Sequence, residues 1–106
     1  MEIASLYVPF PNEQSAIAVI EKLLEKNQIA CANLIPAGQS FYRWEGKIVS
    51  ESEVYVIFKA VRNSIDTLTE NLKKLHPYET PAILSLNCES LNVDYSNWLY
   101  EQVSPK

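Results

Sequence analysis

The segment Phe41-Tyr42-Arg43-Trp44-Glu45-Gly46-Lys47-Ile48 decides the fold of this chain, because its pattern predicts the tip of a long β-hairpin. Glycine takes the positive φ that a tight hairpin turn demands, so Glu45-Gly46 predicts the turn. An apolar run over residues 29–35 leads into the hairpin through a bend or bulge at Pro36-Ala37-Gly38. Residues 47–60 then return as one strand, far longer than the usual length of about five or six residues.

The returning strand changes character along its length. Val54-Tyr55-Val56-Ile57-Phe58 is apolar on both faces, which is typical of a strand that is covered on both sides. Ser50-Glu51-Ser52-Glu53 is polar, so we expect the hairpin to project at its tip and to be covered near its base. An apolar strand edge of this length favours oligomerisation through edge pairing. The aromatic residues that we expect at subunit contacts are Tyr42, Trp44, Tyr55 and Trp98.

A short strand over residues 3–8 and a helix over residues 13–26 precede the hairpin. Two prolines end the strand, Asn12 is placed to cap the helix, and Asn27 is a plausible stop. The apolar side chains of this helix recur at helical spacing, which predicts one face packed on a sheet. The predicted stripe consists of Ile17, Ile20 and Leu24, widened by Ala16, Val19 and Leu23.

A second helix follows the hairpin, and either Asn63 or Ser64 is expected to cap its start. Its apolar positions at helical spacing are Ile65, Leu68, Leu72 and Leu75. The helix is expected to end at His76-Pro77, because the residue before a proline disfavours helical backbone dihedrals.

Two further elements complete the predicted fold. Pro81 opens a last strand over residues 82–86, and a helical segment follows over residues 94–103. That helix carries Tyr95, Trp98 and Leu99 on one side. The order of elements predicts an α+β, ferredoxin-like βαββαβ sandwich with a long hairpin and an extra C-terminal helix, forming a single domain over residues 1–106. The second and fourth strands are then opposite edges of the sheet.

Composition narrows the class of function. A formal net charge of -4 gives no electrostatic footprint for nucleic acid or for a membrane surface. The chain shows neither a basic leader followed by an apolar stretch nor an apolar run of about 20 residues that could span a membrane. We therefore expect a soluble, cytoplasmic protein with a small-molecule or protein partner.

The two cysteines and the two glycines carry little chemistry. Cys31 and Cys88 lie far apart, without C-x-x-C spacing, and the predicted topology keeps them from forming a disulfide within one subunit. Cys31 is expected to behave as a small buried hydrophobe, and Cys88 is the more open candidate for a metal-reactive thiol. Neither Gly38 nor Gly46 opens a helix, so the sequence contains no phosphate-binding loop.

The candidate site is the segment Leu75-His76-Pro77-Tyr78-Glu79-Thr80-Pro81, which contains the one histidine of the chain. Together with Lys59, at the end of the central strand, its His76, Tyr78 and Glu79 predict a cleft for general acid/base chemistry or for an anionic ligand. An alternative is structural, because a histidine that ends a helix can interact with the helix dipole.

Five blocks of the sequence, in order and nearly end to end, resemble the CutA1 family of divalent-cation tolerance proteins. They are Ala30-Cys31-Ala32-Asn33-Leu34-Ile35-Pro36, Tyr42-Arg43-Trp44-Glu45-Gly46-Lys47-Ile48, Glu53-Val54 with Ile57-Phe58-Lys59, Leu75 to Pro81, and Asp94-Tyr95-Ser96-Asn97-Trp98-Leu99. The resemblance implies a homotrimer of ferredoxin-like subunits joined by the long hairpins and similar to PII signalling proteins. It also implies a link to copper and other divalent metals, with no settled catalytic activity.

The chain departs from the family where copper ligands are expected. The family's first-strand cysteine aligns with Val8, and its histidine pair is reduced to Leu75-His76. His76, with Glu79 as an oxygen donor, is the metal-ligand set that the resemblance leaves, and one imidazole is a poor site for copper. We expect a metal-responsive, non-enzymatic trimer. The alternatives are a PII-like scaffold that binds a small anion or a partner protein, and a hydrolase or isomerase with His76 as base.

Overall fold

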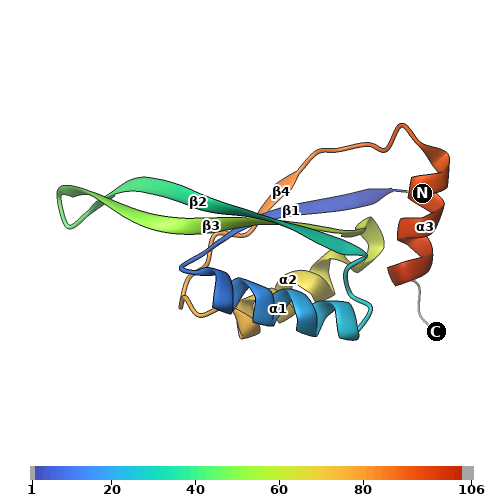
Figure 1. Ribbon diagram of the computed structural model, residues 1–106, viewed down its shortest axis with the longest axis horizontal. Coiled ribbons are helices and arrows are strands. Elements are labelled where there is room, and N and C mark those ends of the chain that lie inside the picture. The colour runs from blue at the N-terminus through green and yellow to red at the C-terminus, as the bar shows by residue number, and fades with distance from the viewer. Residues whose placement is uncertain (1, 104–106) are drawn as a thin grey trace.

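The structure, a computed structural model, describes residues 2–103 and forms one antiparallel sheet with three α-helices. The elements in chain order are β1 (Ile3–Phe10), α1 (Glu13–Glu25), β2 (Cys31–Trp44), β3 (Lys47–Val61), the 3-10 turn η1 (Arg62–Ser64), α2 (Ile65–Leu75), β4 (Leu84–Leu86) and α3 (Val93–Val103). The strand order is β2-β3-β1-β4, and α1 and α2 cover the same face of the sheet (Figure 1). The predicted α+β class, the order of the elements and the two edge strands are confirmed.

The hairpin turns where the sequence predicted and extends well past the rest of the sheet. Glu45 and Gly46 have φ values of 49° and 79°, the paired positive dihedrals of a tight hairpin turn. β3 pairs with β1 only as far as Val54, which lies opposite Phe10. Beyond that pair, residues 38–53 form a two-stranded projection that we call the arm (Figure 1). The expectation of a projecting tip is confirmed.

A bulge marks the base of the arm. The pairing of β2 with β3 shifts between Ile35 and Gly38, and Ala37 takes a φ of 59°. A bulge adds an unpaired residue to one strand, so it bends the ladder and increases its twist. The bend predicted at Pro36-Ala37-Gly38 is therefore present inside one continuous strand, and it re-aims the arm relative to the covered part of the sheet.

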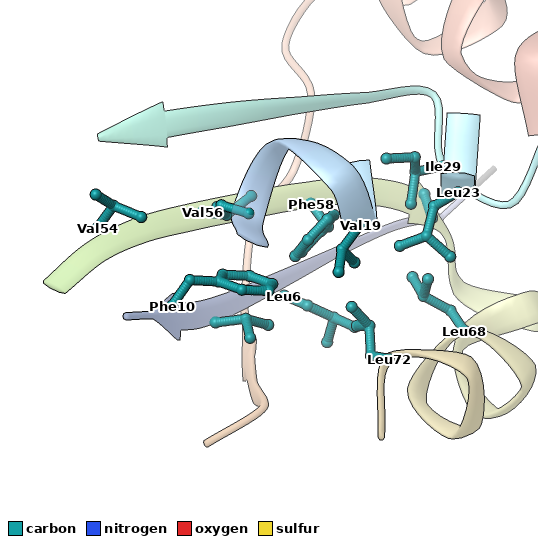
Figure 2. Packing of buried hydrophobic residues seen from close by; sticks show 13 residues of the cluster. Leu6, Phe10, Val19, Leu23, Ile29, Val54, Val56, Phe58, Leu68 and Leu72 are labelled. Atoms are coloured by element: carbon teal, nitrogen blue, oxygen red, sulfur yellow. The ribbon is translucent and has the colours of Figure 1, made fainter. Parts of the chain in front are cut away.

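The core lies between the sheet and the two helices (Figure 2). Side chains alternate across a strand, so every second residue of β1 and of β3 points at the helices. The strands contribute Leu6, Val8, Phe10, Val54, Val56 and Phe58, and the helices contribute Val19, Leu23, Leu68 and Leu72. All of these side chains are buried, so their packing holds β1, β3, α1 and α2 together.

The ends of α1 match the prediction, but its buried stripe does not. Asn12 accepts a hydrogen bond from the Ser15 backbone N–H at 2.8 Å, and Asn27 takes the left-handed φ of 57° after the helix. Ile17 and Leu24, expected at the centre of the stripe, are 45% and 41% exposed. The apolar arc of the helix is wider than the sheet can cover, so the contact centres on the other predicted members, Ala16, Val19 and Leu23.

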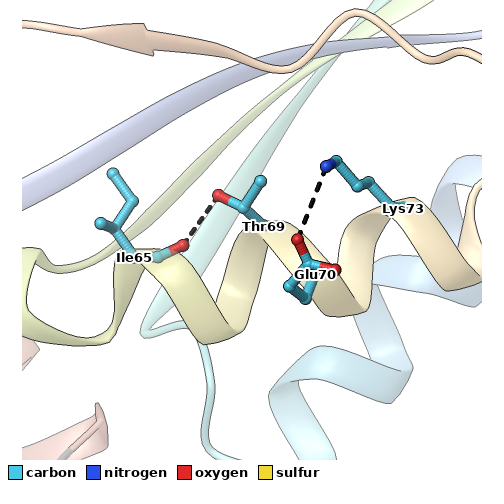
Figure 3. A network of polar contacts seen from close by, with 4 residues as sticks. All are labelled: Ile65, Thr69, Glu70 and Lys73. Carbon is cyan, nitrogen blue, oxygen red and sulfur yellow. Dashed lines mark hydrogen bonds and ion pairs between the residues drawn. The ribbon is translucent and has the colours of Figure 1, made fainter.

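α2 begins without the predicted side-chain cap. Ser64 occupies the cap position, yet its hydroxyl donates back across η1 to the carbonyl of Val61, the last residue of β3, at 3.0 Å. Along α2, the half-buried Thr69 hydroxyl donates to the Ile65 carbonyl at 2.7 Å, and the exposed Lys73 pairs with Glu70 at 3.5 Å (Figure 3). An exposed ion pair such as Lys73–Glu70 contributes little stability, so packing of Leu68 and Leu72 holds the helix. None of the helices within residues 2–103 is long and apolar enough to cross a membrane.

β4 forms the edge of the sheet beside β1, and α3 follows it in the chain. β4 covers only Leu84–Leu86 and pairs with residues 5–7 of β1, so the predicted strand over residues 82–86 is shorter than expected and Pro81 precedes it. Leu99 and Val103 of α3 are buried and belong to a second, smaller apolar cluster. The remaining members of that cluster are Ile3, Ala30 and Val61, with Tyr95 packed against them. α3 therefore closes one end of the sheet (Figure 1), while the arm extends from the opposite end.

Candidate functional site

His76 lies directly after α2 and is nearly buried, with 6% of its surface exposed. Its backbone N–H still donates to the Leu72 carbonyl at 2.9 Å, but its ψ of 140° is extended, because Pro77 follows. The imidazole stacks on the ring of Phe10 with centroids 4.3 Å apart, and the Tyr78 ring lies against it at 4.9 Å.

Both ring nitrogens of His76 are used by backbone groups. The Tyr78 N–H donates to Nδ1 at 3.0 Å, so Nδ1 carries a lone pair and the proton of the neutral ring is on Nε2. Nε2 then donates to the Pro9 carbonyl at 2.7 Å. β4 pairs with β1 only as far as Tyr7, so the Pro9 carbonyl lies beyond the end of that ladder and accepts from the imidazole. The arrangement supports the structural interpretation of His76.

The protonation of this site is set mainly by burial. Burial lowers the pKa of His76, while the bond to the Pro9 carbonyl and the charge of Glu53 act in the opposite direction. Burial, followed by the hydrogen bond to Glu53, raises the pKa of Tyr78 well above that of a free phenol. The site therefore favours a neutral imidazole and a neutral phenol, both held as hydrogen-bonding groups.

Glu53 is the centre of a cluster that the sequence did not predict. The Tyr78 hydroxyl donates to Glu53 Oε2 at 2.6 Å, and the Ser40 hydroxyl donates to Glu53 Oε1. Because Ser40 has already given its proton, the Tyr55 hydroxyl is the donor in the 3.0 Å contact with Ser40. Tyr55 also stacks on Tyr7, with ring centroids 5.6 Å apart. We call Ser40, Glu53, Tyr55 and Tyr78 the Glu53 cluster.

The predicted four-residue cleft is assembled only in part. His76 and Tyr78 lie together, but Lys59 pairs with Ser5 whereas Tyr55 pairs with Pro9. That register places Lys59 about 13 Å farther along β3 than Tyr55, at roughly 3.3 Å per residue. Glu79 is exposed, and it takes no part in the hydrogen bonds and ion pairs found among residues 2–103. One subunit therefore presents His76 and Tyr78 with Glu53, rather than with Lys59 and Glu79.

The donor set of one chain does not fit a copper ion. Within residues 2–103, three or more histidine, cysteine, aspartate or glutamate side chains do not come together as a metal-binding group. The imidazole of His76 offers no free lone pair, because Nδ1 accepts from Tyr78 and Nε2 carries the proton. Residues 2–103 of a single subunit therefore form no metal centre.

The cysteines lie apart from the Glu53 cluster. Cys31 is half-buried with Sγ 3.5 Å from the Tyr95 hydroxyl, so its expected full burial is met only in part. This contact, together with burial, raises the pKa of Tyr95 to about 12. Cys88 is exposed, as expected, and both thiols are free.

The four aromatic residues predicted at subunit contacts fall into two groups. Tyr42 and Trp44 on the arm, and Trp98 on α3, are exposed. Tyr55 is half-buried because it is stacked and hydrogen-bonded within its own chain. Only the first group leaves a large aromatic surface for another chain.

Comparison with known proteins gives a consistent result. The model of the family described as CutA1 divalent ion tolerance protein matches residues 4–102. The divalent-cation tolerance protein CutA of Thermotoga maritima is 47% identical over 98 residues, which are 92% of this chain and 96% of that protein. The crystal structure of the divalent ion tolerance protein CutA1 from Ehrlichia chaffeensis superposes with a TM-score of 0.94 at 30% identity, covering 98% of this chain and 97% of that one. Crystalline CutA1 from Pyrococcus horikoshii gives a TM-score of 0.90 at 40% identity, covering 96% and 99%.

Proposed function

Because this chain belongs to the CutA1 divalent ion tolerance protein family, we propose that it acts in divalent-cation tolerance as a cytoplasmic homotrimer joined through its arms. The observation that carries the proposal is the apolar surface of the arm. Phe41, Trp44 and Ile48 are 70%, 63% and 75% exposed. Large apolar side chains gathered on a projecting hairpin are typical of a protein-protein contact rather than of a solvated surface.

The open face of the sheet supports the same proposal. α1 and α2 cover one face, and apolar residues on the opposite face remain exposed on the edge strands, among them Ile35 on β2 with Leu84 and Leu86 on β4. Both edges also carry backbone groups that another chain can pair with. In the proposed trimer, arms and open faces bury one another, and the Glu53 cluster faces a neighbouring subunit.

Assembly can be tested by sedimentation. The expected mass is that of three chains, and a double substitution of Phe41→Ser with Ile48→Ser is expected to yield monomers. Ile17→Ser is the matched control, because Ile17 is 45% exposed on α1, away from the arm, and its loss should leave the trimer intact. A wild-type chain that sediments as a monomer at micromolar concentration would overturn the assembly proposal.

The tolerance role can be tested in a host that lacks its own copy of the gene. Expression of the wild-type chain should restore growth at raised copper(II) concentration, and Ile17→Ser should restore it equally. The Phe41→Ser, Ile48→Ser protein should restore it poorly, because the role is assigned to the assembled form. Equal growth with and without the wild-type chain would contradict the tolerance role.

A second candidate, a trimeric scaffold without a metal site, is favoured by the hydrogen bonds of His76. Binding of copper by this ring requires Nδ1 to lose the Tyr78 N–H or Nε2 to lose the Pro9 carbonyl. A metal site with His76 and Glu79 therefore needs an open loop and further donors from another subunit. Calorimetric titration with copper(II) separates the two, with Cys88→Ser as background to remove the exposed thiol. Equal binding by His76→Gln and its parent supports the scaffold, and binding lost only in His76→Gln supports the metal site.

A further inference from the structure

Glu53 joins two segments that are far apart in the sequence. Its Oε1 accepts from Ser40 on the β2 side of the arm, and its Oε2 accepts from Tyr78 at 2.6 Å. Tyr78 belongs to the connection between α2 and β4, residues 76–83, which we call the loop. Because each oxygen accepts from a different segment, the single carboxylate links the β2 strand of the arm to the loop.

The position of Glu53 in the sheet makes this link mechanically important. Toward the tip of the arm, Val54 is the final residue of β3 that pairs with β1. The next residue in that direction, Glu53, pairs with β2 but not with β1. Its partner on β2 is Gly38, the residue that ends the bulge. Packed helices and a third strand hold the sheet on one side of this point, whereas the arm beyond it is a two-stranded ribbon. A ribbon interrupted by a bulge is where a sheet bends most easily.

The loop depends on the same few contacts. Residues 76–83 belong to no helix or strand, so the sheet ladder does not fix them. Their ordered bonds are made at His76, which anchors the backbone of Tyr78 and binds the Pro9 carbonyl, and at the Tyr78 hydroxyl. Loss of the phenol contact therefore removes the side-chain bond between the loop and the arm, while the His76 bonds and the packing of Ile83 on the core remain.

We propose that Glu53 couples the arm to the loop, so that displacement of Tyr78 loosens the arm at the bulge and displacement of the arm loosens the loop. A ligand or neighbouring subunit that draws away the Tyr78 phenol frees Oε2, and Ser40 then keeps its contact with Tyr55 but loses, through Glu53, its link to the loop. Movement of the arm carries Glu53 and Ser40 together away from Tyr78 and so weakens the hold on the loop. The device acts inside each chain and requires no metal ion.

Hydrogen-deuterium exchange of the full chain, read by peptide, tests the coupling in both directions. Tyr78→Phe removes one hydroxyl from the loop, and Ser40→Ala removes one from the arm. Tyr42→Phe is the matched control, because its hydroxyl also donates to an arm carboxylate, Glu51, outside the Glu53 cluster. We expect Tyr78→Phe to speed exchange in arm peptides, and Ser40→Ala to speed exchange in loop peptides, by about 2- to 10-fold, the usual effect of one hydrogen bond.

Two further results decide the proposal. The double variant Ser40→Ala, Tyr78→Phe should change exchange by less than the product of the single effects, since both act on one carboxylate. Effects confined to the substituted segment, or an equal change in the loop with Tyr42→Phe, would overturn the coupling. Sedimentation of each variant separates this outcome from the trimer proposal, because the exchange effect within a chain is expected whether or not the chain assembles.

Discussion

The ring of Tyr55 covers Gly38 so closely that a β-carbon added at residue 38 would lie 2.0 Å from Tyr55 Cε2. The bulge at the base of the arm therefore needs a residue without a side chain, for reasons of space rather than of backbone conformation. Tyr55 cannot easily yield, since it stacks on Tyr7 and donates to Ser40.

Gly38→Ala is expected to destabilise the chain by about 1–3 kcal/mol, the usual cost of overpacking. The free energy of unfolding in urea measures it. In a Tyr55→Ser background the same change should cost much less, because the obstructing ring is gone. A similar cost in both backgrounds would show that Tyr55 is not the obstruction.

Leu23→Ala and Leu24→Ala test the corrected position of α1. Leu23 is fully buried and Leu24 is 41% exposed, although they are neighbours in the sequence. Loss of the buried side chain should cost about 2–5 kcal/mol of unfolding free energy, and loss of the exposed one about 0.5 kcal/mol or less. Urea unfolding of the two variants measures the difference, and equal costs would contradict the orientation of the helix.

Asn12→Ala removes the acceptor that caps α1. The expected loss is about 1 kcal/mol of unfolding free energy, typical of an N-cap. Asn63→Ala is the control, since Asn63 is exposed in η1 just before α2, and the residue at the cap position of α2, Ser64, makes no capping bond with its side chain. Thermal unfolding should separate the two variants, and an Asn12→Ala protein as stable as wild type would rule the cap out.

The pH dependence of stability should contain a contribution from His76. Its folded-state pKa is lowered by burial, so between that value and the ordinary value of 6.5 the unfolded chain binds more protons. This contribution is present above about pH 6.5 and is lost as the pH falls through the folded-state pKa. Urea unfolding at pH 7.5 and 5 should show a smaller drop for His76→Gln than for wild type.

The glutamine variant suits that experiment because its amide can still donate toward the Pro9 carbonyl but does not titrate. His76 is the one histidine in the sequence, so carboxylate effects common to both proteins cancel in the difference. An equal or larger drop in the variant would contradict the assigned role of burial.

Periodicity and turn chemistry were enough to predict most elements, and packing decided the rest. Glu45-Gly46 and Asn12 act through local backbone geometry, so their roles follow from the residues themselves. The exposure of Ile17 does not, because the six apolar positions of the predicted stripe leave the rotation of α1 about its own axis open. The length of β4 is likewise not set by its own residues, because it depends on pairing with residues 5–7 of β1.

The candidate site was predicted only on the loop side. Proline after His76 fixes the end of α2, and Tyr78 follows at once, so these two residues could be found by inspection. Ser40 was missed because the bulge shifts the register of β2 against β3 between Ile35 and Gly38. Glu53 was missed because it ends the polar segment that was assigned to the projecting tip. Simple alternation along β2 assigns Ser40 to the wrong face. Lys59 was placed in the cleft because it ends the central strand, although its strand partners, Ser5 and Cys31, lie farther along the sheet.

The arm also determines how the molecule moves through solvent. The described chain measures 47 × 26 × 22 Å, and the projecting hairpin contributes to its longest dimension. An elongated particle experiences more friction than a sphere of equal mass, so a single chain would elute somewhat earlier from a sizing column than a spherical protein of its mass. Three chains wrapped around one another's arms would form a rounder particle with less excess drag. Elution volume alone is therefore a misleading measure of assembly for this protein, and an absolute mass from light scattering or sedimentation equilibrium is needed.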